Sequence, residues 1–565
     1  MLDLSRMTCL GETLRDVLLK YRSNVAFIEA ERDRENARYT YTEVRKEAER
    51  FAALLQDYGF KSGDRCAILM SNQSKWPITA TGALWTGAIL VPIDYKLTSS
   101  EQAALLSHAE PKVLVVEWPI WMRLKDESLQ DLLVFVTEAP VGSDLGKAVR
   151  WETTPGRAFT YVGRSREDVA SIVYSSGTGG RPKGCMLTHA NYLVQAEELG
   201  KLYPIEEHDR YFSILPTNHA IDFMCGFLLP LHFGGAVVHQ RTLRPEFLAS
   251  TMKRYGISHV TLVPMILKAL ERKIREKIDS LPRWKRTILD TVLTINEFAT
   301  QRGPNYELSR RLLKQIHQEF GGKLRFIFAG GAFVESSAAQ FFYRLGIPVV
   351  IGYGLTEAGT TLTLNDLKPF RNDTVGKALS CVSLELRDVN DQGVGEVWAK
   401  GPTVMKGYYK DAELTGETIV NGWLRTGDLG TVDASGHLKL VGRSKNMIVT
   451  EGGKNIYPED IENVFADVPG SQEHCVFSSS FVWKNEKLAG EKMILVLRPR
   501  SDRPDPTLEA QLRERNQRLT DYKRLGGYVV WEREFPRTAS MKLKRDALAE
   551  QLAKELNRKK AVREL

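Results

Sequence analysis

The feature that most constrains the fold is a regular alternation of short apolar runs with helical stretches through the first two-thirds of the chain. "RCAILMSN", "KVLVVEW", "ISHVTLVP" and "KLRFIFAGGA" are apolar runs of strand length, and "WPITATGALWTGA" is typical of a packed helix. Apolar strands separated by helices are typical of parallel sheets that are covered on both faces. The sequence therefore predicts an α/β fold whose large N-terminal part contains parallel-type sheets with helices.

The pattern changes after Asp373. "SLELRDVNDQGVGEVWAKGPTVMKGYY" combines short strands with Gly/Asp turns, which predicts an antiparallel β-subdomain. After "GRSKN" the chain mixes short strands and helices and is strongly charged. We expect a large N-terminal domain over residues 1–441, a hinge over 442–446 and a small, mobile α+β C-terminal domain over 447–565.

A charged helical segment lies between Leu267 and Phe320. It can be interpreted as a lid or as a solvent-facing helical insertion. The second interpretation is favoured because charged helical faces are common on protein surfaces.

The composition narrows the class of protein. The chain has 565 residues, of which 43% are hydrophobic and 26% charged, as in a soluble globular protein with several folding units. Its net charge of +8 suits anionic ligands such as nucleotides, coenzymes and acidic lipid surfaces. We expect no nucleic-acid partner, because a basic excess alone does not indicate one.

The cysteines and the apolar segments predict the compartment. The six cysteines lie far apart without zinc spacing, which fits free thiols in a reducing cytosol. The N-terminus lacks a continuous apolar core, and "ITATGALWTGAILVPI" is shorter than the ~20 residues that span a bilayer. We therefore expect a cytoplasmic protein with at most peripheral membrane contact.

A glycine-rich stretch, "YSSGTGGRPKGCMLTHAN", follows an apolar strand. Glycines let backbone N–H groups surround an anion, Ser175, Ser176 and Thr178 add hydroxyls, and Lys183 adds a cation. Thr188 can cap the helix that follows. The common nucleotide loop requires Ser or Thr after its lysine, but here Gly184 follows Lys183. By itself the stretch is a flexible turn about as often as it is a phosphate site.

Three further stretches contain candidate ligands. "GYGLTEAGTT" follows an apolar strand, and its Glu357 can hold Mg²⁺ on phosphate oxygens or cap a helix. In "GWLRTGDLG", Asp428 can accept hydrogen bonds from both hydroxyls of a ribose or stabilise an Asx turn. In "FPRTASMKLKRDAL", Lys542 is by itself one more surface lysine.

Taken together and in this order, the four stretches resemble the adenylate-forming superfamily, which includes acyl-CoA synthetases, luciferases and the adenylation domains of peptide synthetases. The resemblance covers nearly the whole chain. The charged insertion after Leu267, followed by "GGKLRFIFAGGAFVE", is most similar to the long-chain fatty acyl-CoA synthetases.

The resemblance implies that a carboxylate attacks the α-phosphate of ATP to give an acyl-adenylate and pyrophosphate. A thiol, usually coenzyme A, then displaces AMP. Such chemistry needs charge neutralisation more than a protein nucleophile, and the sequence has no G-x-S-x-G elbow.

The resemblance also implies roles for individual residues around ATP. The β- and γ-phosphates and the leaving pyrophosphate would be bound by Ser175, Ser176, Gly177, Thr178 and Lys183. Mg²⁺ would lie between Thr178 and Glu357, which with Lys542 are the candidate catalytic residues. Adenine and the edge of the acyl pocket would contact Gly330, Gly331, Ala332, Gly352, Tyr353 and Gly354, with Leu355 and Thr356 also at the nucleotide. Asp428 would bind the ribose with help from Arg443, and Lys542 would bridge the α-phosphate and the substrate carboxylate.

Further positions match the acyl tunnel and the hinge. His219 matches a residue that gates the tunnel, although a structural role is equally consistent. Lys445 matches the pivot of the small domain, and Gly452 and Gly453 would let pantetheine pass close to the backbone. Two departures put local details in doubt: Gly179 stands where Thr is usual, and Met541 stands where Gly is usual.

We expect an acyl-CoA synthetase that acts on a medium- to long-chain fatty acid and uses ATP, Mg²⁺ and coenzyme A. An acyl-AMP ligase that loads an acyl carrier protein is an alternative, as is a ligase for an aryl or other small-molecule carboxylic acid. A non-catalytic nucleotide-binding protein on the same fold is a third. The joint presence of Lys542, Glu357 and Asp428 argues against that last hypothesis, because a binding module does not need a lysine at the α-phosphate.

Overall fold

The computed structural model divides the chain into two compact units. One contains Met1–Leu384 and Ala399–Leu424, and the other contains Glu385–Trp398 and Arg425–Leu565. The contacts therefore assign strands upstream of residue 441 to the second unit, and the predicted boundary at 441 stays a prediction. The structure describes residues 3–32, 34–125, 127, 132–153, 158–175, 182–203, 205–449, 455–466, 468–483, 492–501, 506–538 and 543–565.

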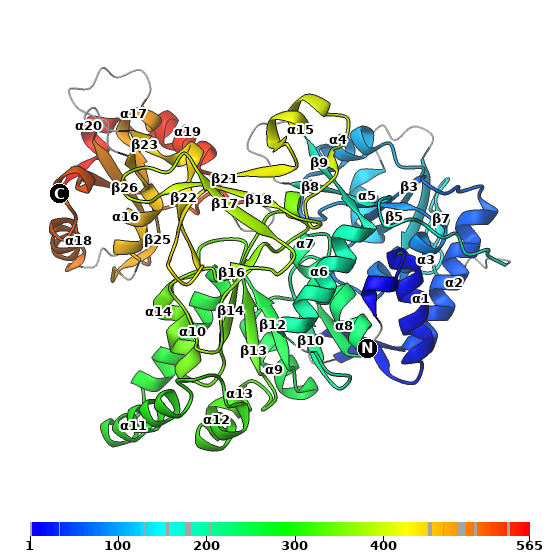
Figure 1. Ribbon diagram of the computed structural model, residues 1–565, viewed down its shortest axis with the longest axis horizontal. Coiled ribbons are helices and arrows are strands. Elements are labelled where there is room, and N and C mark those ends of the chain that lie inside the picture. Colours follow the sequence, from blue (N-terminus) through cyan, green and yellow to red (C-terminus); the bar gives the residue numbers. More distant parts are fainter. Residues whose placement is uncertain are drawn as a thin grey trace. The chain divides into compact units, whose positions relative to one another are not determined.

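The first unit contains a nine-stranded sheet whose six central strands are parallel (Figure 1). Its outer strands pair antiparallel. The order along the sheet is β16 (Lys377–Ala378), β15 (Thr363–Leu364), β14 (Val349–Tyr353), β13 (Phe326–Ala329), β12 (His259–Leu262), β10 (Arg210–Ser213), β11 (Ala236–Gln240), β1 (Val25–Glu31) and β2 (Arg34–Thr40).

A second, eight-stranded sheet is mostly parallel as well, with an antiparallel hairpin and one short strand at one edge. Its order is β19 (Gly407–Tyr408), β9 (Lys183–Thr188), β8 (Val169–Ser175), β4 (Ile89–Pro92), β3 (Arg65–Leu69), β5 (Val113–Glu117), β6 (Leu133–Thr137) and β7 (Val149–Arg150).

The helices of this unit separate the strands along the chain. They are α1 (Leu10–Lys20), α2 (Tyr41–Asp57), α3 (Lys75–Trp85), α4 (Ser99–Ala109), α5 (Trp118–Leu124), α6 (His189–Leu202), α7 (Ala220–Asp222), α8 (Leu229–Phe233), α9 (Pro245–Tyr255), α10 (Pro264–Asp279), α11 (Arg283–Ala299), α12 (Tyr306–Leu312), α13 (Lys314–Glu319), α14 (Ser336–Arg344) and α15 (Ala412–Thr418). Within the described ranges, no helix is long and apolar enough to cross a membrane.

The local sequence explains these elements. All five residues of β5 are buried, as expected for a parallel strand that is covered on both faces. Helix α3 is buried on all sides from Trp76 to Trp85, which explains its apolar composition. Thr188 caps α6 in a capping box with Asn191, as predicted. The predicted α/β fold with parallel sheets is confirmed.

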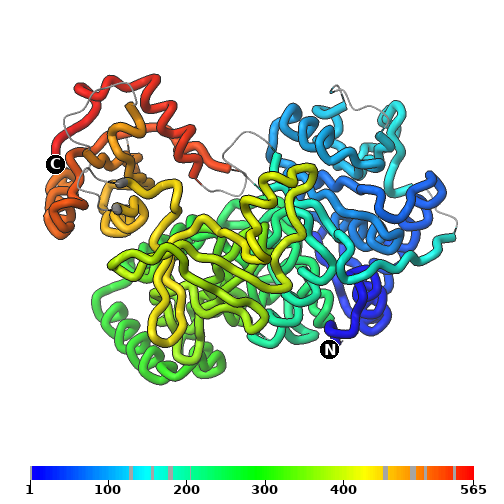
Figure 2. The backbone as a smooth tube through the Cα atoms, turned by 45° about the horizontal axis from the view of Figure 1, so that its top comes forward, coloured from blue at the N-terminus to red at the C-terminus, as the bar shows by residue number. Residues whose placement is uncertain are grey.

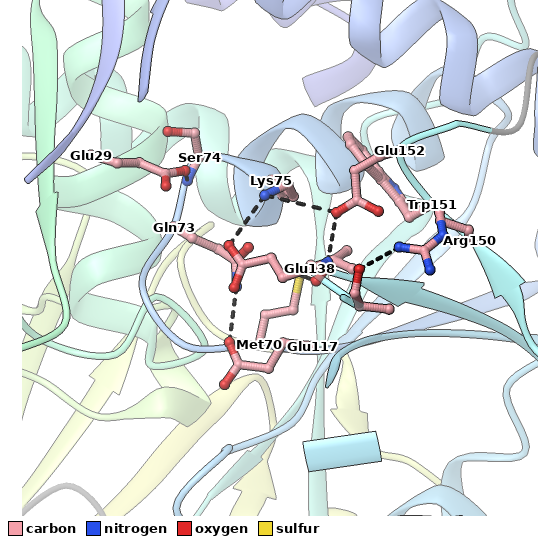
Figure 3. A network of polar contacts seen from close by, with 12 residues as sticks. Glu29, Met70, Gln73, Ser74, Lys75, Glu117, Glu138, Arg150, Trp151 and Glu152 are labelled. Carbon is pink, nitrogen blue, oxygen red and sulfur yellow. Dashed lines mark hydrogen bonds and ion pairs between the residues drawn. The ribbon is translucent and has the colours of Figure 1, made fainter. Parts of the chain in front are cut away.

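Polar contacts join the two sheets of the first unit, in part through the network around Lys75 (Figure 3). The ammonium of Lys75 lies 3.2 Å from Glu138 and 3.9 Å from Glu152. Arg241, which follows β11, donates two hydrogen bonds of 2.8 and 2.9 Å to Glu138, which follows β6. Burial by itself would raise the pKa of Glu138, but Arg241 and Lys75 together outweigh burial and lower it. The network therefore holds the carboxyl ends of strands from both sheets together.

The second unit is α+β. Strands β17 (Ser383–Arg387), β18 (Gly395–Lys400) and β21 (Trp423–Val432) are neighbours in one sheet, and β22 (Leu438–Arg443) pairs antiparallel with β21. A short antiparallel pair and a four-stranded sheet follow, with helices around them. These elements are β23 (Ile448–Val449), β24 (Asn455–Ile456), α16 (Pro458–Val464), β25 (Ser471–Ser478), α17 (Ser479–Val482), β26 (Met493–Pro499), α18 (Leu508–Gln517), β27 (Leu525–Val530), α19 (Arg545–Glu555), α20 (Arg558–Ala561) and β28 (Arg563–Glu564).

Candidate functional site

The β8–β9 hairpin holds both ends of the predicted phosphate loop. Ser175, the last residue of β8, lies opposite Lys183, the first residue of β9, in the antiparallel register. The loop between them contains Ser176, Gly177, Thr178 and Gly179, which lie outside the described residues. The ladder therefore places one hydroxyl and one cation side by side at the base of the loop.

Glu357 lies in a short 3₁₀ turn, Thr356–Ala358, after the end of β14. The hydroxyl of Tyr408 donates a hydrogen bond of 3.0 Å to its carboxylate. The ammonium of Lys183 lies 5.9 Å from the centre of the Tyr408 ring. Tyr408 belongs to β19, which pairs with β9, so the strand carrying Lys183 and the turn carrying Glu357 meet at one aromatic ring.

Burial and the charge of Glu357 change the pKa values of the side chains next to Glu357. Burial, and then the charge of Glu357, raise the pKa of Tyr408, so its hydroxyl remains a proton donor at neutral pH. The same two causes, in the same order, raise the pKa of the Cys185 thiol well above its usual value. Cys185 is therefore not a thiolate nucleophile, in agreement with a reaction that needs none.

Two polar residues of α6 hydrogen-bond to the segments that contain Glu357 and Tyr408. The Gln195 side-chain amide donates 2.7 Å to the carbonyl of Ala358, next to Glu357. The Asn191 amide donates to the carbonyls of Pro402 and Val404, at 2.7 and 3.0 Å, shortly before Tyr408.

The sequence prediction missed Tyr408, Asn191 and Gln195. The stretch "KGYY" contains Tyr408, but no local sequence pattern links Tyr408 to Glu357, which lies 51 residues earlier.

A backbone shelf forms where β13 and β14 end. A Cβ at Gly330 would lie 2.8 Å from the carbonyl oxygen of Gly352, and one at Gly354 would lie 2.0 Å from that of Thr360. Gly331 has φ of +79°, which L side chains rarely adopt. These positions favour glycine because neighbouring backbone fills the Cβ position at Gly330 and Gly354 and because φ is positive at Gly331. The neighbouring predicted residues differ in exposure: Tyr353 is buried, Leu355 and Thr356 are half-buried, and Ala332 is exposed.

His219 precedes α7, next to this shelf. Its Nε2 lies 3.2 Å from Oδ2 of Asp94. Thr360 donates 3.1 Å to the carbonyl of Ala220, which joins the segment of His219 to the one that faces Gly354. The side chain of Ile221 comes within 3.6 Å of the position that a Cβ on Gly331 would occupy. His219, Gly330 and Gly331 therefore lie in one region, and the acyl tunnel stays a prediction.

Asp222 is a fully buried carboxylate at the end of α7. It accepts hydrogen bonds of 2.9 Å from the hydroxyls of Tyr211, Ser213 and Thr217. Burial raises the pKa of Asp222 to about 6, and the three hydroxyls limit that rise. A π-helix, Phe223–Leu228, follows directly, and such helices occur often at functional sites.

In the second unit the predicted ribose ligands are paired with each other. Asp428 on β21 lies opposite Arg443 on β22. The Nε of Arg443 lies 2.7 Å from Oδ1 of Asp428, and Asp428 is buried whereas Arg443 is exposed on one side. The pair could hold a ribose at Asp428 while Arg443 orients the carboxylate.

The predicted pivot, Lys445, lies in a 3₁₀ turn, Ser444–Asn446. The side chain of Asn446 donates 2.8 Å to Glu459 of α16, which connects the turn to the rest of the second unit. Gly452, Gly453, Met541 and Lys542 lie outside the described residues.

The residues present fit a bound Mg²⁺. Among the described side chains, no three His, Cys, Asp or Glu residues converge on one point. Mg²⁺ is usually held by one or two carboxylates together with substrate phosphates, rather than by an all-protein cage. Glu357, which is half-buried at the base of the phosphate loop, supplies such a carboxylate.

Comparisons with known proteins bear on the family and the fold. The family model described as "AMP-binding enzyme" matches residues 14–409. The 2-succinylbenzoate–CoA ligase of Bacillus licheniformis is 28% identical, over 77% of this chain and 80% of its own. The long-chain-fatty-acid–CoA ligase FadD15 of Mycobacterium bovis is 27% identical, over 73% of this chain and 71% of its own. The crystal structure of the anthranilate CoA ligase AuaEII in complex with anthranoyl-AMP has the same fold, with a TM-score of 0.78, 22% identity, and coverage of 98% of this chain and 100% of that one.

Proposed function

Because this chain belongs to the family of AMP-binding enzymes, we propose that it activates a medium- or long-chain fatty acid as an acyl-adenylate and transfers the acyl group to coenzyme A. Its class, an AMP-forming acid–CoA ligase that uses ATP, Mg²⁺ and coenzyme A, follows from the family. The observation that carries the proposal is the meeting of Lys183 and Glu357 at the Tyr408 ring, at the base of the phosphate loop.

In the first half-reaction, an oxygen of the substrate carboxylate attacks the α-phosphorus of ATP, and the bond to the β-phosphate breaks. Lys183 and the hydroxyl of Ser175 bind the phosphates that leave as pyrophosphate. Glu357 would hold Mg²⁺, and the bound ion would neutralise phosphate charge. Tyr408 orients the Glu357 carboxylate, because its hydrogen bond occupies one of the two oxygens. Lys542 neutralises the charge that accumulates where the carboxylate meets the α-phosphate.

In the second half-reaction, the thiol of coenzyme A attacks the acyl carbonyl, and the bond to AMP breaks. The thiol loses its proton as the thioester forms. Gly452 and Gly453 border the path of pantetheine, and Lys445 is the pivot about which the small domain changes position between the two half-reactions.

A fatty acid is the proposed substrate because apolar side chains lie next to the backbone shelf of Gly330, Gly331 and Gly354. Ile221 lies against Gly331, and the π-helix that follows α7 consists of buried residues such as Phe223 and Met224. Similarity to FadD15 of Mycobacterium bovis supports the same substrate class. His219, whose Nε2 lies 3.2 Å from Oδ2 of Asp94, is the proposed gate.

Three rival functions are distinguishable. Similarity to the 2-succinylbenzoate–CoA ligase of Bacillus licheniformis favours an aromatic acid. A carrier protein could replace coenzyme A as the thiol acceptor. A binding protein without catalysis would release neither pyrophosphate nor AMP.

One screen separates these possibilities. Pyrophosphate release is measured with hexanoate, decanoate, palmitate, benzoate and 2-succinylbenzoate, each with and without coenzyme A or a phosphopantetheinylated carrier protein. Each buried CH₂ contributes about 0.8 kcal/mol at most. The kcat/KM should therefore rise with chain length and then level off. If an aromatic acid gives the highest kcat/KM, the fatty-acid proposal is wrong, and AMP release that needs the carrier protein would favour the ligase alternative.

A reducing, cytoplasmic location is part of the proposal. All six cysteines are free thiols, and all but Cys381 are buried. Free buried thiols are common where disulfides do not form.

A further inference from the structure

Helix α11 carries large apolar side chains on its outer face. Trp284 is 61% exposed, Ile288 55%, Ile295 52% and Phe298 73%. We call these four residues the α11 strip. The helix packs into the core of its unit through other residues, Leu289, Val292 and Leu293. Figure 1 and Figure 2 both show α11 at the outer edge of its unit.

Helical geometry makes the α11 strip one continuous surface. At about 100° per residue, its four side chains fall within a sector about 80° wide and extend along about 21 Å of helix. The buried residues of α11 point roughly 130° away from this sector. Single exposed apolar residues are normal on protein surfaces, but a row of four large ones marks an interaction surface.

The segment that contains the α11 strip is also strongly basic. Residues 264–323 contain thirteen Lys and Arg but seven Asp and Glu, so they hold six of the eight net positive charges of the whole chain. Arg283 and Lys285 flank Trp284, and the Lys285 ammonium lies 5.3 Å from the centre of the indole ring.

Several of these cations are available to a ligand. In the part of the chain that the structure describes, eight have no carboxylate oxygen within 4.0 Å: Lys273, Arg283, Lys285, Arg286, Arg302, Arg310, Lys314 and Lys323. The segment therefore combines an outward apolar row with unneutralised positive charge.

We propose that the α11 strip is a membrane-docking surface, which lies flat on bilayers that contain anionic lipids. An interfacial helix needs an apolar face that enters the acyl boundary and basic residues that meet anionic headgroups. Trp284 and Phe298 are suited to that boundary, because large aromatic side chains are favoured there. An acidic protein partner would match the charge but would not need a 21 Å row of four large apolar side chains. This proposal does not depend on which acid the enzyme activates. Docking would bring the enzyme to the bilayer, where long-chain acids partition.

The test is co-sedimentation of the full-length protein with vesicles of phosphatidylcholine, with and without phosphatidylglycerol. The parent should bind the anionic vesicles, and added salt should weaken the binding. A quadruple variant, Trp284→Gln, Ile288→Gln, Ile295→Gln and Phe298→Gln, should bind roughly tenfold more weakly or worse, because it removes the apolar contribution. Glutamine is a good helix former, so the helix itself should persist.

Matched controls separate docking from general stickiness. Leu19→Gln with Leu202→Gln removes two exposed apolar side chains elsewhere, 47% and 51% exposed, and should leave vesicle binding unchanged. Arg283→Glu with Lys285→Glu should abolish the preference for anionic over neutral vesicles. Thermal melting shows whether each variant is folded, independently of any enzymatic activity.

Three results would overturn the proposal. The parent could fail to bind anionic vesicles, or the quadruple variant could bind them as tightly as the parent does. Sedimentation velocity could instead show a parent dimer that the quadruple variant dissociates, without vesicle binding in either protein. That last result would assign the α11 strip to a second copy of the chain.

Discussion

The Tyr408 hydroxyl donates a 3.0 Å hydrogen bond to the Glu357 carboxylate, across the boundary between the two sheets of the first unit. Tyr408 lies on the edge strand β19 of the eight-stranded sheet, whereas Glu357 follows β14 of the nine-stranded sheet. The contact therefore couples the phosphate-loop hairpin to the turn that carries the proposed metal ligand.

Tyr408→Phe should weaken the use of Mg²⁺ without changing the fold. A hydrogen bond to a charged group contributes about 1.5–3 kcal/mol, so the Mg²⁺ concentration for half-maximal pyrophosphate release should rise roughly tenfold to a hundredfold. Tyr409→Phe is the matched control, because no hydrogen bond of the Tyr409 hydroxyl occurs among the described residues. Equal Mg²⁺ dependence in both variants and the parent would remove Tyr408 from the site.

Glu357→Gln should slow adenylate formation by ~10²-fold or more, as expected from the loss of one electrostatic stabiliser. The shape of the side chain is retained, so ATP binding should change less than turnover. In the double variant with Tyr408→Phe, the two losses should not add, because Tyr408 acts through Glu357. Near-normal turnover at ordinary Mg²⁺ would exclude the metal role.

Gly354→Ala should destabilise the backbone shelf where β13 and β14 end. The new Cβ would meet the Thr360 carbonyl oxygen at 2.0 Å, so the backbone must shift. We expect a lower melting temperature and a loss of protection by ATP against heat. Gly416→Ala is the control, since nothing lies within 4 Å of its Cβ position and alanine favours its helix, α15. A Gly354→Ala protein that melts and binds ATP like the control would contradict the shelf.

Asp222→Asn should change how stability depends on pH. The pKa of Asp222 is about 6 in the folded protein, above the ordinary value of 3.8, so folding favours the protonated form. That stabilisation is fully present below pH 3.8 and is lost as the pH rises through about 6, at a cost of about 3 kcal/mol. Asparagine cannot ionise, so the variant should gain melting temperature relative to the parent over this range. Asp290→Asn, at an exposed position, should show no such change.

Lys542 and Lys445 should serve different half-reactions. Lys542→Ala should abolish pyrophosphate release from ATP and acid, yet largely spare thioester formation from a supplied acyl-adenylate. Lys445→Pro should do the reverse, because proline fixes φ near −65° and restricts the pivot. Each half-reaction is measured separately, and equal loss of both halves in two folded variants would contradict domain alternation.

Much of the first unit was predictable because its signals are local. The run "KVLVVEW" became β5, and "WPITATGALWTGA" became the buried helix α3, since continuous apolar sequence must be covered on every side. The place of Glu357 after a strand end was predictable, because glycines and a carboxylate follow an apolar run. Its partner Tyr408 was not, since nothing near it in the sequence indicates which sheet edge it joins.

The sequence by itself determined the order of the motifs, the type of each central element and the chemical groups available for ATP. Only the tertiary structure decided that Tyr408 reaches Glu357, that three hydroxyls surround Asp222, and that the α11 strip faces outward. The physical reason is the same in each case. Periodicity sets the angles between side chains on one element, but sheet order and packing decide which face is covered and which distant residues meet.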